Sequence, residues 1–453
     1  MLRAITIIMT VCLGGQLWGE DKNPTIPHEK YVLDNGLTVL LSEDHSAPFV
    51  ATSVWYKVGG VNERPKKTGL AHLFEHLMFE GSAHVKQDDH FKLLEGVGAF
   101  QVNASTSFDR TNYFETVPKS QLELSLALES SRMFWLNISQ AKLDEQRAVV
   151  RREREQRYET SPYGLATLSL WQSIFPEANP MHGRVIGSHE DLEQASLSDV
   201  QSFYDQFYGP TNASIALVGD FTSSEVKKLI NQYFASLPNS GLQAKPSIAA
   251  PVLTEQEILR YQEKLGRLPM IRIQYLTPAV FKPGDADLDV IAHILTGGEH
   301  GRLTKAITRE QSLTSSVAAY QQSFGQVSVF TIDAMLNPGV DDVAVIKEID
   351  KVIAGLSIEP PSALEIERAR NAILTNYYFN LQDLGGDGGK AEALQSYQLF
   401  TGDSNFMEKD LARYQAVNSQ SIAESSAKYL PAERARKILI ASPLISNVAN
   451  KDR

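Results

Sequence analysis

Cysteine is almost absent from this chain of 453 residues. The one cysteine, Cys12, lies in an apolar N-terminal segment that we expect to be removed from the mature protein. The remaining chain then contains no thiol. This excludes disulfide bonds and any catalytic role for cysteine in the mature protein.

Long apolar runs are also lacking. The N-terminus carries Arg3, a short apolar run from Ala4 to Leu13 and small residues around Gly19. This run is too short to span a bilayer comfortably, but the pattern is typical of a secretory signal peptide. We therefore expect residues 1–19 to be a signal peptide and the protein to be periplasmic or secreted. An uncleaved membrane anchor is less favoured, and a mitochondrial transit peptide would need a basic amphipathic segment.

Basic patches and phosphate-binding loops are missing as well. The net charge is −11, and no cluster of Lys and Arg is interleaved with aromatic residues, so we expect no nucleic-acid partner. The glycine-rich run 385–389 lacks the Lys-Ser/Thr ending of a phosphate loop and follows no clear strand. We interpret it as a flexible turn.

What the chain does contain is the pentapeptide His72-Leu73-Phe74-Glu75-His76. Residues four apart on a helix share one face, so His72 and His76 could bind one zinc ion from the same side. Glu75 falls on the same flank, where it could hold a metal-bound water. The order is the reverse of His-Glu-x-x-His, the inverzincin arrangement, and it indicates metal-assisted hydrolysis.

The alternative is an ordinary helix whose histidines are satisfied by their neighbours. Apolar residues at helical spacing argue against it, because they predict that this helix is buried. Unpaired imidazoles and a carboxylate would be costly in such a helix. The apolar residues are Leu70, Leu73, Phe74, Leu77 and Met78.

A catalytic zinc site usually has three protein ligands and one open position. Residues 140–158 form a charged stretch with helical spacing, which contains Glu145, Glu153 and Glu155. The residues alone do not decide among these carboxylates, and a charged stretch of this kind is ordinarily a solvated helix face.

Five segments resemble the pitrilysin/insulinase metallopeptidases, a family that includes the mitochondrial processing peptidases and many bacterial two-subunit peptidases. They are His72 to Ser82, Asn103 to Tyr113, Gln146 to Glu153, Pro162 to Gly164 and Val185 to Ser188. The likeness runs from about Tyr31 to about Pro443 and is most specific in the first half.

The resemblance implies that Glu153 is the third ligand, because it falls at the family's distance from His76. The family often has another glutamate seven residues earlier, where this chain has Gln146 beside Glu145. The role of that position outside the ligand set stays open.

The segment 103–113 alternates small or polar residues and is typical of a strand. The resemblance implies an edge strand that pairs with the substrate backbone, with contacts at Asn103, Ala104 and Ser105. An ordinary sheet strand is the alternative.

Family members often carry an Arg and a Tyr in the non-catalytic half that hold the substrate near the scissile bond. Here Arg309 falls at the Arg position, and Ser315 stands where the Tyr is expected. The resemblance then implies a metal-less homologous partner subunit that supplies the pair. A homodimer that uses other groups is the alternative.

The chain also shows a faint internal duplication. Residues 48–56 and the helix with the metal motif have counterparts in 269–276 and 288–295. With His76 laid on His293, Asp289 and Ala292 replace His72 and Glu75, so the second copy should lack a metal site.

We expect a catalytic domain over 20–238, a Pro/Gly/Ser/Ala-rich linker over 239–256 and a second homologous domain over 257–453. Mixed strand and helix patterns predict the α+β class, in which helices pack on mainly antiparallel sheets. The resemblance adds that the two domains form half of a clam-like chamber.

Together these features predict a zinc-dependent endopeptidase for short or unfolded peptides. His72, His76 and Glu153 would bind one Zn²⁺, and Glu75 would act as general base. One alternative is a non-catalytic scaffold or assembly subunit, but such family members usually lose the metal motif, which is whole here. Another is a metal-dependent hydrolase that acts on something other than peptides.

Overall fold

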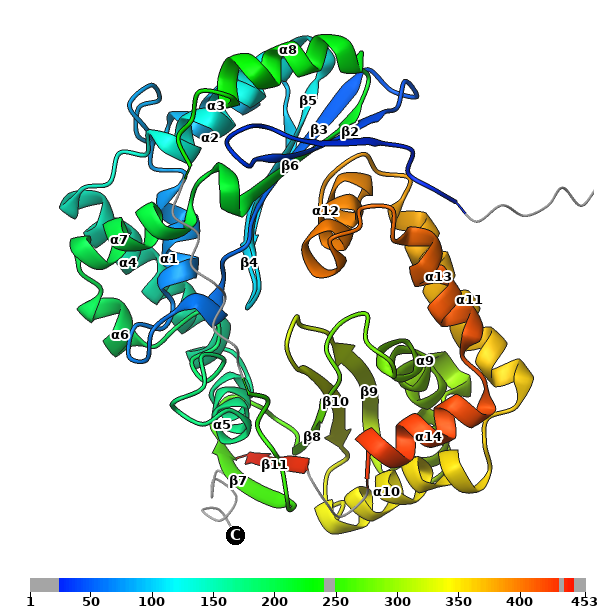
Figure 1. Ribbon diagram of the computed structural model, residues 1–453. Coiled ribbons are helices and arrows are strands. Elements are labelled where there is room, and N and C mark those ends of the chain that lie inside the picture. The colour runs from blue at the N-terminus through cyan, green and yellow to red at the C-terminus, as the bar shows by residue number, and fades with distance from the viewer. Residues whose placement is uncertain (1–23, 240–248, 432–435, 444–453) are drawn as a thin grey trace, which may run out of the picture.

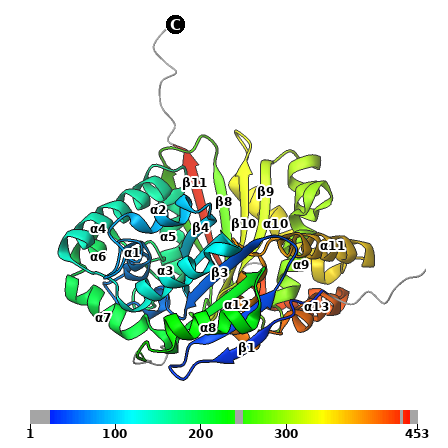
Figure 2. The same cartoon turned by 90° about the horizontal axis from the view of Figure 1, so that it is seen from above.

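The computed structural model describes residues 24–239, 249–431 and 436–443. The expected signal peptide and half of the expected linker lie outside these residues. Each half of the chain contains one sheet, and Figures 1 and 2 show the two halves facing each other, with helices around both. No helix of the described part is long and apolar enough to cross a bilayer.

The first sheet has six strands in the order β1-β2-β6-β3-β5-β4. Every neighbouring pair is antiparallel except β2 and β6. The strands are β1 (Glu29–Val32), β2 (Thr38–Glu43), β3 (Phe49–Tyr56), β4 (Phe100–Thr106), β5 (Thr111–Pro118) and β6 (Ala213–Gly219).

The second sheet has five strands in the order β7-β11-β8-β10-β9, and only β7 and β11 are parallel. When β2-β6-β3-β5-β4 is laid on β7-β11-β8-β10-β9, every neighbouring pair runs in the same sense. The α+β class is thus confirmed, and the repeated topology agrees with the duplication. The strands are β7 (Glu257–Glu263), β8 (Met270–Thr277), β9 (Thr314–Gln322), β10 (Ser328–Leu336) and β11 (Arg436–Pro443).

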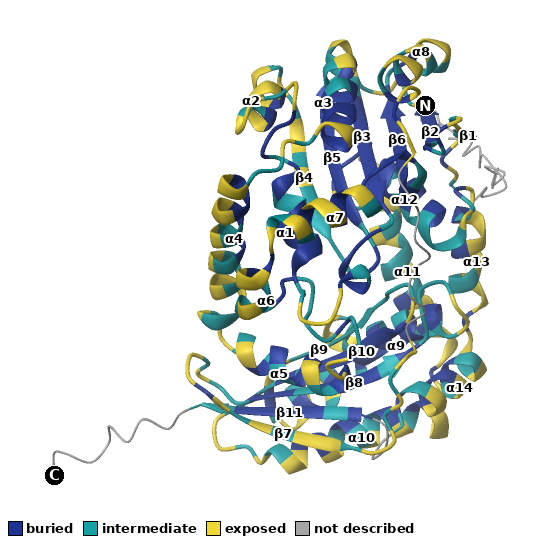
Figure 3. Ribbon diagram, turned by 60° about the vertical axis from the view of Figure 1, so that its left-hand side comes forward, coloured by how far each residue is buried: buried dark blue, intermediate teal, exposed yellow. Residues whose placement is uncertain are grey.

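Helices bury one face of each sheet. The first-half helices are α1 (Leu70–Leu77), α2 (Asp89–Gly96), α3 (Leu122–Phe134), α4 (Gln140–Arg154), α5 (Gly164–Ile174), α6 (His189–Gln194), α7 (Leu197–Phe207) and α8 (Ser223–Phe234). The second-half helices are α9 (Asp285–Thr296), α10 (Asp342–Ile358), α11 (Ala363–Asn380), α12 (Lys390–Thr401), α13 (Met407–Ala416) and α14 (Ser419–Tyr429). Figure 3 shows the central strands of the first sheet buried and the outer side of α4 exposed.

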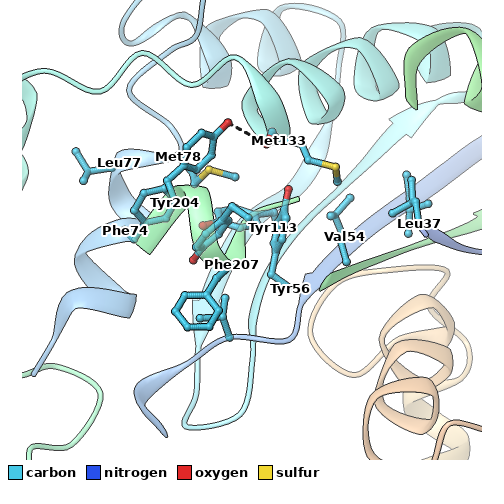
Figure 4. Close-up of a cluster of buried hydrophobic side chains, with 14 of the residues drawn as sticks. Leu37, Val54, Tyr56, Phe74, Leu77, Met78, Tyr113, Met133, Tyr204 and Phe207 are labelled. Atoms are coloured by element: carbon cyan, nitrogen blue, oxygen red, sulfur yellow. Dashed lines mark hydrogen bonds between the residues drawn. The ribbon is translucent and has the colours of Figure 1, made fainter. Parts of the chain in front are cut away.

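The largest core cluster holds α1 against the first sheet (Figure 4). Phe74 of α1 packs on Tyr208, with 4.2 Å between ring centroids, and stacks on Tyr204 at 5.6 Å. The hydroxyl of Tyr204 donates to the carbonyl of Met133 on α3 at 2.9 Å. The apolar side of α1 is therefore fixed from several directions, which sets the direction of its polar side.

The two halves exchange one helix each. Helix α12 of the second half packs on β6 and β3, and α5 of the first half packs on β11 (Figure 1). Glu392 of α12 accepts hydrogen bonds from Ser53, from Trp55 Nε1 at 3.1 Å and from Asn112 Nδ2 at 2.7 Å. Each half therefore contributes a helix to the hydrophobic core of the other. The strands of the first sheet all precede residue 238, and those of the second sheet all follow residue 256.

The chain over 103–113 departs from the single strand that its alternation predicts. It is a hairpin, in which β4 ends at Thr106 and β5 begins at Thr111. The hydroxyl of Ser107 accepts hydrogen bonds from the amides of Asp109 and Arg110 at 3.2 and 3.3 Å. A serine that bonds to the backbone in this way favours a turn over a continuous strand.

The expected helix over 140–158 ends early, since α4 passes into a π-helical turn over Glu155–Glu159. The run 385–389 is a turn, as predicted. Gly386 and Gly388 have φ of +74° and +89°, which other residues adopt at a cost. A Cβ on Gly385 would lie 2.6 Å from that of Ala51, so this turn lies directly against β3 of the first sheet.

We expect Glu392→Ala to lower the free energy of unfolding by about 2–4 kcal/mol, because it leaves the donors of Trp55 and Asn112 buried without an acceptor. The side chain of Glu392 is only 6% exposed. Urea unfolding measures the change. The exposed Glu408 on α13 is the matched control, and Glu408→Ala should change stability by less than about 0.5 kcal/mol. Equal effects of the two substitutions would contradict the role of α12 as a bridge.

Candidate metal centre

Helix α1 carries three polar residues on the side opposite its apolar stripe: His72, which is buried, and Glu75 and His76, which are partly buried. Its start is fixed by Glu63, whose buried carboxylate accepts hydrogen bonds from the amides of Gly69 and Ala71 at 3.0 and 2.8 Å. These amides have no partner within the helix, and a carboxylate is favoured at a helix N-terminus. The apolar stripe predicted from the sequence is buried along its full length.

Helix α4 places Glu153 opposite the two histidines. Its Oε2 lies 3.6 Å from His72 Nε2 and 3.3 Å from His76 Nε2. The imidazole rings are 4.8 Å apart at an interplanar angle of 80°, so their Nε2 atoms converge without stacking. Within the part of the chain that the structure describes, this is the one group of three or more His, Cys, Asp or Glu side chains arranged to hold a metal.

The spacing of these atoms fits a zinc ion. Zinc binds nitrogen and oxygen at about 2.0–2.2 Å in tetrahedral geometry, which puts neighbouring donor atoms about 3.3–3.6 Å apart. Both distances to Glu153 fall in this range, and the three donor atoms lie within 4.8 Å of one another. Two imidazoles and one carboxylate are also a donor set that zinc prefers.

The protonation states fit as well. Burial, together with the neighbouring His76, lowers the pKa of His72 to about 4, so its imidazole stays neutral at physiological pH. Burial acts to raise the pKa of Glu153, but the two histidines and Arg157 outweigh it and lower this pKa. Arg157 Nη2 lies 2.9 Å from the other carboxylate oxygen of Glu153. Neutral imidazoles and an ionised carboxylate are the forms that bind metal.

Glu75 lies beside this group but is not part of it. Its Oε2 accepts a hydrogen bond from the hydroxyl of Thr106, at the end of β4. Burial raises the pKa of Glu75, which moves the carboxylate toward the range useful for proton transfer near neutral pH. The sequence pattern gave no signal for Thr106, which joins the edge strand to Glu75.

His72, His76 and Glu153, which we call the metal group, open into a cavity of about 530 Å³. Asn103, Ala104 and Ser105 of the edge strand form one wall of it. The second half contributes Gln322 and Phe324, which sequence reasoning missed because nothing in their local pattern points to the first half. The other lining residues are Ser107, Phe108, Tyr158, Arg184, Val185 and Ile186, together with Glu75, Thr106, Arg157 and the metal group.

Arg309 lies elsewhere. It is exposed in a π-helical turn over Thr304–Glu310, where it forms an ion pair with Glu299 at 3.1 Å, and it does not line the cavity. Ser315, at the expected Tyr position, is also exposed and outside the cavity. Gln146, which replaces the second glutamate, donates a hydrogen bond to Glu80 at 2.6 Å. None of these three residues contacts the metal group.

The fold is similar to that of solved protein structures over most of the chain. A protease from Helicobacter pylori superposes with a TM-score of 0.85 at 25% identity, covering 93% of this chain and all of that one. The first half of the periplasmic protease PqqL from Escherichia coli superposes with a TM-score of 0.73 at 18% identity, covering 92% and 93% of the two chains. The second likeness concerns the fold alone.

Sequence relatives cover most of the chain. The zinc protease PqqE of Helicobacter pylori is 28% identical over 384 residues, which are 84% of this chain and 86% of the relative. A probable mitochondrial-processing peptidase subunit beta of Arabidopsis thaliana is 22% identical over 413 residues, covering 88% and 75%.

Two family models match successive parts of the chain, and the second match begins before β6, the last strand of the first sheet in chain order. The insulinase model, peptidase family M16, matches residues 38–170, which contain the metal group. The model of the peptidase M16 inactive domain matches residues 194–373, in agreement with a second copy that has lost the metal site. Together the two models span more than half of the sequence. The chain therefore belongs to the insulinase family of zinc proteases, peptidase family M16.

Proposed function

We propose that this protein is an endopeptidase that uses one zinc ion to hydrolyse short or unfolded peptides. The observation that carries the proposal is the convergence of His72, His76 and Glu153 at metal-binding distances beside the partly buried carboxylate of Glu75. A scaffold role would leave this costly polar group without a purpose, because buried polar groups are retained only where partners or function compensate for them.

The three ligands would hold the zinc ion, which supplies a Lewis acid that activates water and polarises the scissile carbonyl. Glu75 accepts the proton of the attacking water and passes it to the leaving amine. The acceptor is Oε1, the oxygen that Thr106 does not hold, since the hydroxyl of Thr106 fixes the carboxylate through Oε2.

We propose that the backbone of the substrate binds along the edge strand β4. Among the described strands it pairs only with β5, and the amide of Ala104 donates a hydrogen bond to the side chain of the neighbouring Asn103 at 2.9 Å. An unpaired strand edge can add an extended peptide as a further strand. Only a segment without its own sheet or helix can pair in this way, which favours short or unfolded substrates.

We also propose a partner subunit. Arg309 is engaged with Glu299 away from the cavity and Ser315 lies outside it, so these two positions do not supply the expected Arg/Tyr pair. A metal-less homologue would supply the pair, and a homodimer is the alternative. The relation to a mitochondrial-processing peptidase subunit supports a role within an assembly. Removal of residues 1–19 on export to the periplasm, or on secretion, completes the proposal.

Glu75→Gln should lower kcat for a quenched peptide by about 10²–10⁴-fold, because it removes the proton acceptor. Zinc content should stay at one ion per chain, since Glu75 is not a ligand in the proposed set. Peptide cleavage and elemental analysis of the same samples measure both effects. The exposed Glu145 serves as control, and Glu145→Gln should cleave at the wild-type rate. Wild-type turnover by Glu75→Gln would refute the mechanism.

His72→Ala and Glu153→Ala should each lose both zinc and activity, because two remaining ligands hold the ion too weakly. A chelator should abolish wild-type cleavage, and added zinc should restore it. Elemental analysis after dialysis separates these variants from Glu75→Gln. Retention of stoichiometric zinc by Glu153→Ala would show that another group is the third ligand.

The purified chain should cleave peptides faster after it is mixed with a metal-less homologue from the same organism, and the mixture should elute from gel filtration as a heterodimer. If the chain alone elutes as a dimer and cleaves peptides as fast as the mixture does, the homodimer is favoured.

A further inference from the structure

The cavity beside the metal group contains a second charged feature, the guanidinium of Arg184. It comes from the loop between α5 and α6, and it lies over the ring of Trp171 at 4.3 Å. The sequence pattern gave no reason to single it out, since an isolated arginine in a loop is ordinarily a solvated surface residue.

Arg184 has no anionic partner among the described residues. It makes neither a hydrogen bond nor an ion pair through its side chain there, and its Nε is buried without an acceptor. Guanidinium groups carry five N–H donors, and a buried donor without an acceptor, such as this Nε, is costly. Stacking on an indole offsets part of this cost but satisfies none of the donors.

The groups that face Arg184 from neighbouring elements do not neutralise it. They are the hydroxyls of Tyr158 and Tyr320 and the cation of Arg272, which is itself paired with Asp333 at 2.5 and 2.6 Å. Burial lowers the pKa of Arg184, and the positive charge of Arg272 lowers it further.

The carboxylates that line the same cavity are already engaged. Glu75 accepts from Thr106, and Glu153 faces the two histidines and Arg157. Nothing in the described protein supplies the counter-charge that Arg184 lacks, so the structure leaves room for one from outside.

The loop holds Arg184 in a fixed, strained position. Its φ is +51°, in the left-handed region that is unfavourable for a non-glycine residue. Trp171 Nε1 donates to the carbonyl of Met181 at 2.6 Å on one side of the loop. On the other side Gly187 packs so closely on Gly69, the N-cap of α1, that a Cβ there would lie 2.6 Å from Gly69 Cα. The guanidinium is thus positioned relative to the metal helix before any ligand binds, which lowers the cost of binding.

We propose that Arg184 binds a carboxylate of the substrate peptide close to the scissile bond. The carboxylate belongs either to an Asp or Glu side chain or to the peptide C-terminus, and a planar guanidinium suits both. A cavity of 530 Å³ is about 10 Å across if it is round, and an extended peptide advances about 3.3 Å per residue. The carboxylate therefore lies within about three residues of the cleaved bond. This inference rests on the proposed peptidase function and names the substrate class of the same site.

Binding to the zinc-loaded Glu75→Gln protein tests the proposal without cleavage. Fluorescent peptides are compared in matched pairs, with Glu replaced by Gln at each position in turn, and with a C-terminal carboxylate replaced by an amide. We expect the acidic member of one pair to bind about 10- to 100-fold more tightly, the range for a hydrogen bond to a charged group. The pair that responds identifies the source of the carboxylate.

Addition of Arg184→Gln should remove this preference and leave the affinity for the neutral peptides unchanged, whereas Arg184→Lys should keep part of it. Arg260, an exposed arginine paired with Asp342 on the second sheet, is the control, and Arg260→Gln should keep the full preference. Zinc content and the melting temperature of each variant show whether the fold is retained, and Arg184→Lys carries the test if Arg184→Gln does not fold.

Equal affinities within every pair, absence of peptide binding, or a preference that survives Arg184→Gln would each overturn the proposal. Cleavage by the wild-type protein is measured separately. A protein that discriminates acidic peptides through Arg184 but cleaves none would refute the proposed peptidase function and leave the carboxylate site standing.

Discussion

The burial of one side of α1 is the constraint on which the site depends. Phe74 is enclosed by Tyr204 and Tyr208, and the start of the helix is tied to the carboxylate of Glu63. Because this side is fixed, the side chains of His72 and His76 point away from the core and toward Glu153 on α4. The metal group is therefore a consequence of apolar packing, since the packing energy of the core holds polar atoms at a spacing that they would not adopt by themselves.

The exchange of α5 and α12 makes the cavity a property of the whole chain. Glu392 of the second half is bonded to Asn112, and the side-chain carbonyl of Asn112 in turn accepts hydrogen bonds from Ser105 and Arg110 at 2.7 Å. Ser105 belongs to the edge strand that lines the cavity. The inactive half thus supports the proposed substrate strand from behind, while its Gln322 and Phe324 complete the wall in front. The second domain, which lacks the metal ligands, thus has a structural role in the site.

Local patterns predicted what is local. The helical spacing of His72, Glu75 and His76 and the buried stripe beside them follow from a repeat of a few residues, and α1 has both. Glu153 could not be chosen from Glu145 and Glu155 by pattern, because the choice depends on how α4 crosses α1. The hairpin turn at Ser107 was missed, since the alternation continues through it. Thr106 and Arg184 reach the cavity through tertiary contacts that leave no trace in the neighbouring sequence.

The most direct test of this account is a crystal of the zinc-loaded protein measured on both sides of the zinc absorption edge. The account predicts one anomalous peak, within about 2.0–2.2 Å of the Nε2 atoms of His72 and His76 and of a carboxylate oxygen of Glu153. A peak at any other set of side chains, or Glu153 turned away from two rings with no ion between them, would contradict it.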